Sequence, residues 1–205
     1  MDPLLPISLT AIKGNWRAFQ ARKPLLNFKA LKKKILDRDN HTCRFCGFYD
    51  KQYQEVINID HHYKNNHPNN LATACAFCAQ CFFIDSVGLA PQTGGTVIYL
   101  PEISQGDLNH LMRTLFCTSD RDTAYRGKLK SVILSFNDRA QAVTHCFGPN
   151  SDQPNIFGQS LLDAHLPQNA YQHPLIKHLR LLPNKKAFNE QIDYWKQTVF
   201  AKVPI

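Results

Sequence analysis

Two Cys-x-x-Cys pairs constrain the fold of this chain more than any other feature of its sequence. Cys43 and Cys46 form the first pair, and Cys75 and Cys78 form the second. Such a pair bends the backbone tightly and directs both sulfur atoms to one side. Two pairs at this separation are typical of a tetrahedral zinc site with four thiolate ligands and no open position. We therefore predict one structural Zn²⁺ ion on these cysteines; four buried thiols packed as small apolar groups are the alternative.

The cysteine count argues against a disulfide framework. The chain has seven cysteines, an odd number, in 205 residues, and residues 1–6 lack the basic start and the apolar run of a signal peptide. Both features favour a reducing compartment, the cytoplasm. No stretch approaches the roughly 20 apolar residues that cross a bilayer. We therefore expect no direct membrane insertion.

The net charge of +8 admits several kinds of partner, namely nucleic acid, an anionic membrane surface or an acidic protein segment. Much of the excess lies in short runs at Lys29, Lys32, Lys33 and Lys34 and at Lys185 and Lys186. Such runs are commonly the solvated face of a helix. No array of aromatic and basic side chains suited to base stacking or groove reading accompanies the first run. Nucleic acid is therefore not the partner that we expect.

Apolar periodicity and turn residues predict an α+β fold. Before residue 90, we expect residues 7–20 to be irregular or a short strand and a helix to open at Pro24. Loose alternation over Tyr53–His61 indicates a strand. We expect Leu71–Ile84 to be a helix that carries the second cysteine pair near its start.

Beyond Pro91 the predicted elements are mostly helical. A strand at Thr96–Leu100 is followed by a helix that a capping box of Ser104 and Asp107 begins, with a buried stripe of Leu108, Leu111, Met112 and Leu115. Further helices are predicted at Phe157–His165, at Lys185–Phe200, and at Asp122–Cys146 with Leu129, Val132, Ile133 and Phe136 buried. We accordingly divide the chain into a zinc-binding module with an N-terminal extension, residues 1–90, and a mainly helical region, residues 91–205, packed on it; one continuous domain is the alternative.

The segment around the cysteine pairs resembles the zinc-containing HNH endonuclease module. The likeness rests on Leu36–Gly47 (LDRDNHTCRFCG), on Ile57–His62 (INIDHH) and on Asn70-Leu71 before the second pair. It implies a ββα unit in which Asp60 helps to bind a catalytic metal and His61 is the general base that activates water. The family places a further metal-binding histidine directly after the fourth cysteine, where this chain has Ala79. A methyl group coordinates nothing, so we interpret Asp60 and His61 as vestigial catalytic candidates.

Three nearby side chains offer further ligand atoms. We interpret Cys81 as a packed thiol. An alternative zinc ligand is the second interpretation, because thiols suit soft metals. His62 and His67 can in principle supply a ligand, but histidines near such cysteine pairs are commonly hydrogen-bonded structural groups.

Over its full length the chain resembles the IcmJ/DotN family of the Dot/Icm type IVB secretion system, a virulence system of intracellular bacterial pathogens. The likeness takes in the N-terminal segment, the HNH-like centre with Ala79 and the helical second half. It implies a cytoplasmic protein, peripheral at the inner membrane, that binds the cytoplasmic tail of the coupling ATPase DotL. Together with other coupling-complex subunits, such a protein helps to recruit effector proteins for export. A basic domain suits docking on an acidic segment of that partner.

These observations support three hypotheses. We favour a non-catalytic, zinc-stabilised adaptor, and expect no enzyme activity, because Ala79 leaves the catalytic metal short of a ligand. A metal-dependent HNH endonuclease acting on DNA is the alternative. A zinc protein that binds DNA without cleaving it is the third, and the basic run around Lys32 supports it.

Overall fold

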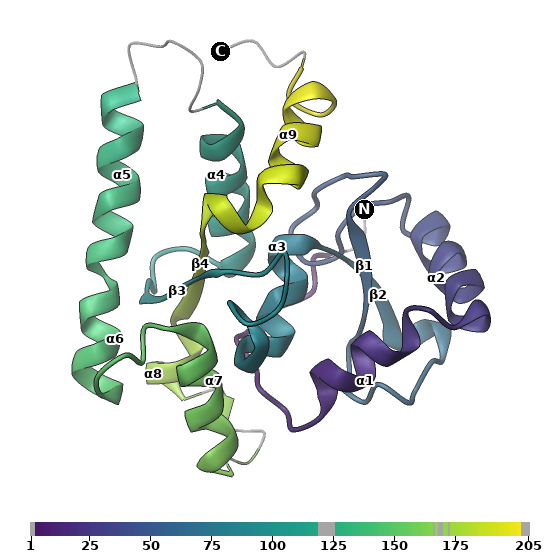
Figure 1. Cartoon of the computed structure of the whole chain (residues 1–205), viewed down its shortest axis with the longest axis horizontal. Helices are drawn as coiled ribbons and strands as arrows, with labels where there is room; N and C mark the ends of the chain where they lie inside the picture. The colour runs from purple at the N-terminus through teal and green to yellow at the C-terminus, as the bar shows by residue number, and fades with distance from the viewer. Residues whose placement is uncertain (1–2, 119–125, 166, 168–169, 172, 202–205) are drawn as a thin grey trace.

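The chain folds into helices arranged around two small antiparallel sheets (Figure 1). The computed structural model describes residues 3–118, 126–165, 167, 170–171 and 173–201. The helices are α1 Asn15–Arg22, α2 Leu26–Arg38, α3 Ala76–Ala79, α4 Gln105–Thr118, α5 Arg126–Asp138, α6 Ala140–Phe147, α7 Pro154–Asp163, α8 Pro174–Lys177 and α9 Asn189–Gln197. The strands are β1 Gln54–Asn58, β2 Leu71–Cys75, β3 Gly95–Tyr99 and β4 Leu179–Pro183. The predicted α+β fold class is confirmed.

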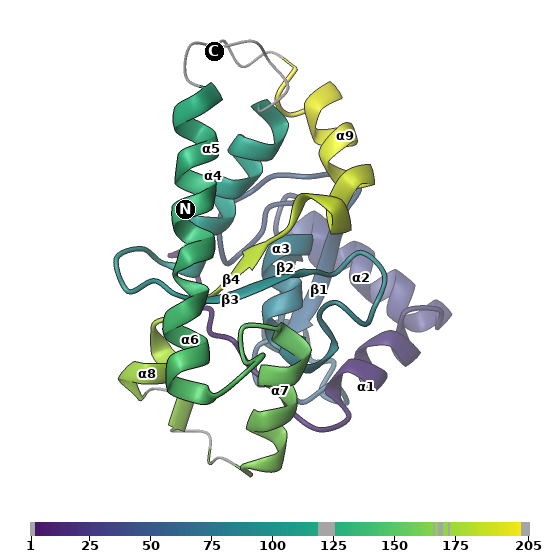
Figure 2. The same cartoon turned by 60° about the vertical axis from the view of Figure 1, so that its left-hand side comes forward.

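Each sheet is a pair of strands. β1 pairs with β2 in the register that places Gln54 opposite Cys75, and β3 pairs with β4 so that Gly95 lies opposite Pro183. The short helix α3 follows β2 directly and packs against β1, β2 and α4. In both Figures 1 and 2, α3 lies near the middle of the molecule, with α4 and α9 above it and α1 and α2 to its right.

The hydrophobic core consists of three clusters of buried side chains. The largest combines residues from both parts of the chain, among them Phe19 and Phe77 with Leu108 and Trp195. A second cluster contains Cys81, Val97 and Phe157, and a third, smaller one joins α2 to the first sheet through Phe28, Ile35, Val56 and Leu71. All four cysteines of the two pairs belong to the largest cluster.

Two predictions in the N-terminal part are wrong. Residues 15–22, expected to be irregular or a strand, form helix α1, whose Phe19 and Arg22 are buried. Gly14 precedes this helix with φ of +83°, a left-handed conformation that glycine adopts without a steric penalty. Residues 71–75 form strand β2, and the helix with the second cysteine pair begins only at Ala76. All five residues of β2 are buried, and a short apolar run does not distinguish a buried strand from a buried helix.

Several predicted elements are confirmed with shifted ends. The first strand occupies the middle of Tyr53–His61, and the strand at Thr96–Leu100 begins one residue earlier, at Gly95. The capping box is confirmed, since Ser104 Oγ accepts a hydrogen bond from the Asp107 N–H at 3.1 Å and lies 2.6 Å from Asp107 Oδ2. The last helix, α9, follows a 3-10 helix at Lys185–Phe188.

The long helix predicted over Asp122–Cys146 is instead two helices, α5 and α6. They meet at Arg139, whose carbonyl accepts a hydrogen bond from the Tyr99 N–H and whose side chain binds Glu102. The expected stripe on α5 is also wrong in part: Val132 is 37% exposed, while Ile133 and Phe136 are half-buried. Leu111 on α4 is 36% exposed. Residues 122–125 and the side chain of Leu129 lie outside the described part of the chain.

Candidate metal centre

The first cysteine pair lies in a tight loop that follows α2. The Cys43 N–H donates to the Phe48 carbonyl at 2.9 Å, and the Gly47 N–H donates to the Cys43 carbonyl at 2.8 Å. Gly47, directly after Cys46, has φ of +74°, a backbone conformation that residues with a Cβ seldom adopt. These bonds turn both cysteine side chains of the pair toward the same side.

The second pair spans the junction of β2 and α3. Cys75 is the last residue of the strand, and Cys78 lies on the helix. The four sulfur atoms lie within 4.8 Å of one another, and no cysteine of the four is more than 3% exposed. Within the described residues this is the one group of three or more histidine, cysteine or acidic side chains whose ligand atoms converge. The four cysteines can therefore hold a metal ion.

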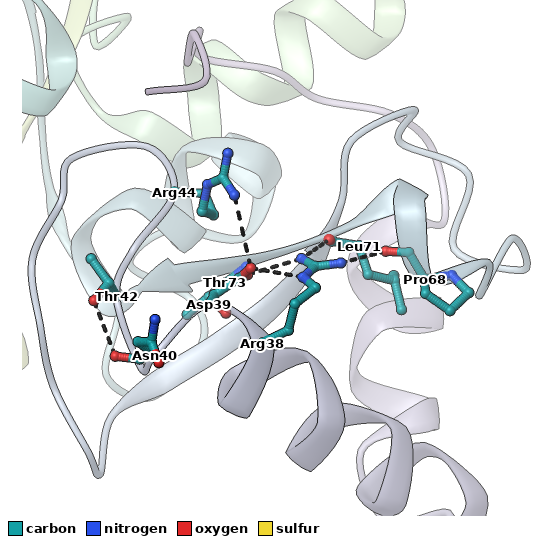
Figure 3. A network of polar contacts seen from close by, with 8 residues as sticks. All are labelled: Arg38, Asp39, Asn40, Thr42, Arg44, Pro68, Leu71 and Thr73. Atoms are coloured by element: carbon teal, nitrogen blue, oxygen red, sulfur yellow. Dashed lines mark hydrogen bonds and ion pairs between the residues drawn. The ribbon is translucent and has the colours of Figure 1, made fainter. Parts of the chain in front are cut away.

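Asp39, at the end of α2, connects the two segments that carry the pairs (Figure 3). Its Oδ2 accepts the Thr73 N–H at 2.9 Å, and the Thr73 carbonyl in turn accepts the Arg44 N–H at 2.8 Å. Arg38 binds both carboxylate oxygens of Asp39, and Arg44 Nη1 lies 3.9 Å from Oδ1. Burial raises the pKa of Asp39, but the bonds from Arg38 and Thr73 outweigh this and hold the pKa below its ordinary value.

Helix α4 covers the cysteine cluster with three side chains. Asn109 Nδ2 donates to Cys78 Sγ at 3.2 Å, and Arg113 Nη2 donates to Cys75 Sγ at 3.0 Å. His110 Nε2 makes a short contact with the Cys46 carbonyl. We did not predict these contacts from the sequence. The signal in the sequence was that Asn109 and Arg113 lie one helical turn apart, next to the apolar positions Leu108 and Met112 on the buried face of α4.

The donor set fits a metal ion such as zinc, which prefers four thiolates in a closed tetrahedral site. Arg113 supports this reading, because it is 1% exposed and carries a positive charge. Among the described residues no carboxylate forms an ion pair with it. A buried cation without a counter-charge is strongly unfavourable. Thiolates bound to a divalent ion supply that negative charge, whereas four neutral thiols do not.

Asp60 lies in the turn after β1, away from the cysteine cluster. It is exposed, and its carboxylate accepts hydrogen bonds from the His62 N–H at 2.8 Å, Asn65 Nδ2 at 2.7 Å and Asn70 Nδ2 at 2.8 Å. Partial desolvation raises the pKa of Asp60, but these bonds outweigh it and the pKa lies below its usual value. The carboxylate thus organises the loop that leads from His61 to Asn70.

His61 and Ala79 line different cavities. His61 has φ of +59°, and its half-buried ring packs 5.4 Å from that of Phe82, in a cavity of about 240 Å³ that Tyr171 also lines. Burial lowers the pKa of His61, and the charge of Asp60 opposes this only in part. Ala79 lines another cavity, of about 160 Å³, with Gln54 and Glu55. The two positions that the HNH pattern would bring to one metal therefore open onto separate spaces.

The other candidate ligands lie outside the cluster. The Cys81 thiol is fully buried in the second hydrophobic cluster and donates to the Phe77 carbonyl at 3.5 Å. Burial raises the pKa of this thiol far above its ordinary value. His62 and His67 are exposed, and His67 Nδ1 accepts the Asn69 N–H at 3.4 Å at the start of a 3-10 turn.

Together, the fold and the site define an α+β protein with a buried four-cysteine cluster that can hold a metal ion. No protein-family model matches the chain. The chain is 42% identical to the type 4 apparatus protein DotN of Legionella pneumophila subsp. pneumophila, over 197 residues that cover 96% of this chain and 92% of the relative. The chain therefore belongs to the DotN family, and the full-length resemblance of its sequence to the IcmJ/DotN family is confirmed.

Proposed function

We propose that this protein is a non-catalytic adaptor subunit of a type IVB secretion coupling complex. The observation that carries the proposal is the 42% identity, over nearly the whole of both chains, to a protein named as part of a type 4 apparatus. Since the identity covers 96% of this chain, it takes in both the cysteine cluster and the helical second half. The relationship therefore extends beyond a shared metal-binding motif.

The adaptor is proposed to hold one structural Zn²⁺ ion on Cys43, Cys46, Cys75 and Cys78. The closeness of the four sulfurs, their burial and the buried cation Arg113 beside them support this. A closed site of four thiolates leaves no position for substrate. The ion would stabilise the fold and take no part in a reaction.

The partner is proposed to be the cytoplasmic tail of the coupling ATPase DotL, bound through an acidic segment. None of the helices in the described part of the chain combines the length and the apolar character that a membrane crossing requires. A cytoplasmic location at the inner membrane would then depend on that anchored partner. The exposed lysines of α2, Lys29, Lys33 and Lys34, offer a basic surface for an acidic segment.

Co-purification with the purified ATPase tail, and membrane fractionation with and without that tail, test the adaptor role. We expect binding at low salt, association that slows as salt rises, and release from the membrane fraction when the tail is deleted. A triple variant with Lys29, Lys33 and Lys34 changed to Glu should associate more slowly. The matched control changes three exposed lysines outside α2, namely Lys13, Lys51 and Lys64, to Glu and should associate faster than the α2 variant. Retention at the membrane without the tail, or no binding to it at low salt, would refute the proposal.

The endonuclease alternative retains one structural argument. Two antiparallel strands followed by a helix, with Asp60 and His61 just after the first strand, follow the order of a ββα nuclease unit. The separate cavities of His61 and Ala79 weigh against it. A DNA-cleavage assay with His61→Ala decides between the two functions.

A further inference from the structure

Arg113 is buried with few hydrogen bonds. Its guanidinium carbon lies 3.6 Å from the centre of the Phe48 ring, with the rings of Phe77 and Trp195 at 5.0 and 5.2 Å. Nε and Nη1 have no hydrogen-bond partner among the described residues, and Nη2 donates to Cys75 Sγ. Aromatic faces attract a guanidinium but do not carry a full negative charge. Among the described residues, the cysteine cluster is therefore the group in contact with Arg113 that can supply a counter-charge.

We propose that Arg113 is a positioning residue of the metal centre and that its positive charge partly balances the negative charge of the metal-bound thiolates. Metal binding is thereby coupled to the packing of α4 and α9 against the cysteine loops. The inference rests on the metal site proposed above. A divalent ion bound by four thiolates has a net charge of two minus, and one adjacent guanidinium halves it. Arg113 also withdraws electron density from Cys75 through its N–H···S bond. Groups that hydrogen-bond to metal ligands commonly tune those ligands in this way.

Trp195 on α9 connects the last helix to Arg113 and to the two cysteine segments. The Trp195 ring lies 5.3 Å from that of Phe48 and 5.4 Å from that of Phe77, in edge-on contacts, and it faces the same guanidinium. Phe48 follows the first cysteine pair, and Phe77 lies within the second. When the metal leaves, the four sulfur atoms are no longer held around one ion, and Arg113 loses the fixed counter-charge and hydrogen-bond acceptor that the metal centre gives it. We then expect α4 and α9 to separate from the cysteine loops together.

Zinc transfer to a chromophoric chelator tests the role of Arg113 in the full-length protein. Side chains that hydrogen-bond to metal ligands typically contribute about 10–100-fold to metal affinity. We expect Arg113→Met to transfer zinc faster by about that factor, and Arg113→Lys, which keeps the charge, to be intermediate. The matched control is Arg180→Met. Arg180 is also buried, at 9% exposed, but its described hydrogen bonds go to the carbonyls of Ile103, Lys177 and Leu179.

A spectroscopic measurement separates an effect on sulfur from a general loss of stability. In the cobalt-substituted protein, the thiolate-to-metal charge-transfer band should move to lower energy in Arg113→Met, because Cys75 becomes more electron-rich. Asn109→Leu, which removes the N–H···S bond to Cys78 without removing a charge, should shift the band in the same direction. An unchanged band in both variants, or zinc transfer equal to that of Arg180→Met, overturns the proposal. If Arg113→Met does not fold, Asn109→Leu and Arg113→Lys decide it.

Hydrogen exchange with and without a zinc chelator tests the coupling. We expect the amides of α4 and α9 to lose protection along with the cysteine loops, while those of α7 keep theirs. Loss of protection confined to the cysteine loops would overturn the coupling. None of these measurements involves the ATPase tail, so their failure is distinct from a failure of the adaptor role.

Discussion

Trp195 donates a hydrogen bond from Nε1 to Asp50 Oδ2 at 2.7 Å, and this bond ties the last helix to the loop that follows the first cysteine pair. Both residues are almost fully buried, at 0% and 1% exposed. The other oxygen of Asp50 accepts the N–H groups of Gln52 and Tyr53. The carboxylate thus depends on three donors, one of which lies 145 residues away in the sequence.

We predict that Trp195→Phe lowers the free energy of unfolding by about 1–3 kcal/mol through the lost bond alone, because it leaves one oxygen of a buried carboxylate unsatisfied. Urea denaturation of the zinc-loaded protein measures the change. The control is Trp16→Phe, since Trp16 is half-buried and its indole has no hydrogen-bond partner within the described structure. Equal losses in the two variants would contradict the importance of the Asp50 bond.

We predict that the purified protein contains one zinc ion per chain and that Cys75→Ser lowers the stability of the N-terminal part markedly, because binding at such sites is coupled to folding. Elemental analysis and thermal unfolding measure both effects. Cys81→Ser is the matched control, because Cys81 is equally buried but belongs to the second hydrophobic cluster. Cys81→Ser should keep its zinc. Absence of zinc from freshly purified wild-type protein would exclude the site.

Asp39→Asn should destabilise the protein by about 1.5–3 kcal/mol at neutral pH, the usual contribution of hydrogen bonds to a charged group. The folded pKa of Asp39 is depressed, so its stabilising contribution is complete above the unfolded pKa of about 3.9. The contribution is lost as the pH falls through the lower, folded pKa. The difference between wild type and variant should therefore shrink below about pH 4. Denaturation across this range measures it.

The control for Asp39 is Asp37→Asn, two residues earlier on the same helix. The side chain of Asp37 is 57% exposed and lies 3.6 Å from His41 Nε2, its ion-pair partner in the structure. An exposed pair of this kind contributes little to stability. A pH dependence equal to that of Asp39→Asn would show that the Asp39 network does not hold the two cysteine segments together.

The cysteine pairs could be predicted from the sequence because their ligand spacing is local. Cys43 and Cys46 need only a tight loop, and two such pairs brought together can hold one shared ion. The contacts that surround them could not be predicted in this way. Arg113 reaches Cys75 across 38 residues and Asp39 reaches Thr73 across 34, so both depend on the tertiary arrangement.

Dependence on the tertiary arrangement also explains the errors in the predicted secondary structure. Residues 71–75 are apolar or small, and only their pairing with Gln54–Asn58 makes them a strand. Strand β4, which the sequence analysis did not identify, is likewise defined by pairing with β3 and by Gln105, whose amide binds both backbone groups of Leu181. Apolar periodicity measures burial and does not identify the partner that a buried segment packs against.

We predict that the protein does not cleave plasmid or single-stranded DNA with Mg²⁺ or Mn²⁺. His61 faces Phe82 in its cavity, whereas Ala79 lines another with Gln54 and Glu55, so the two do not converge on one metal. Asp60 is exposed and already accepts three hydrogen bonds from its own loop. For the same reason Ala79→His should not create cleavage, because the new imidazole enters the cavity that His61 does not line.

Gel assays of plasmid nicking by the wild type, Ala79→His, His61→Ala and His67→Ala test this prediction. We expect the four proteins to be equally inactive, with zinc content unchanged, because none of these positions belongs to the cysteine cluster. His67→Ala is the matched control, since His67 is an exposed histidine of the same loop. Nicking by the wild type that persists in His67→Ala and disappears in His61→Ala would identify His61 as a working general base. The endonuclease reading would then replace the non-catalytic adaptor.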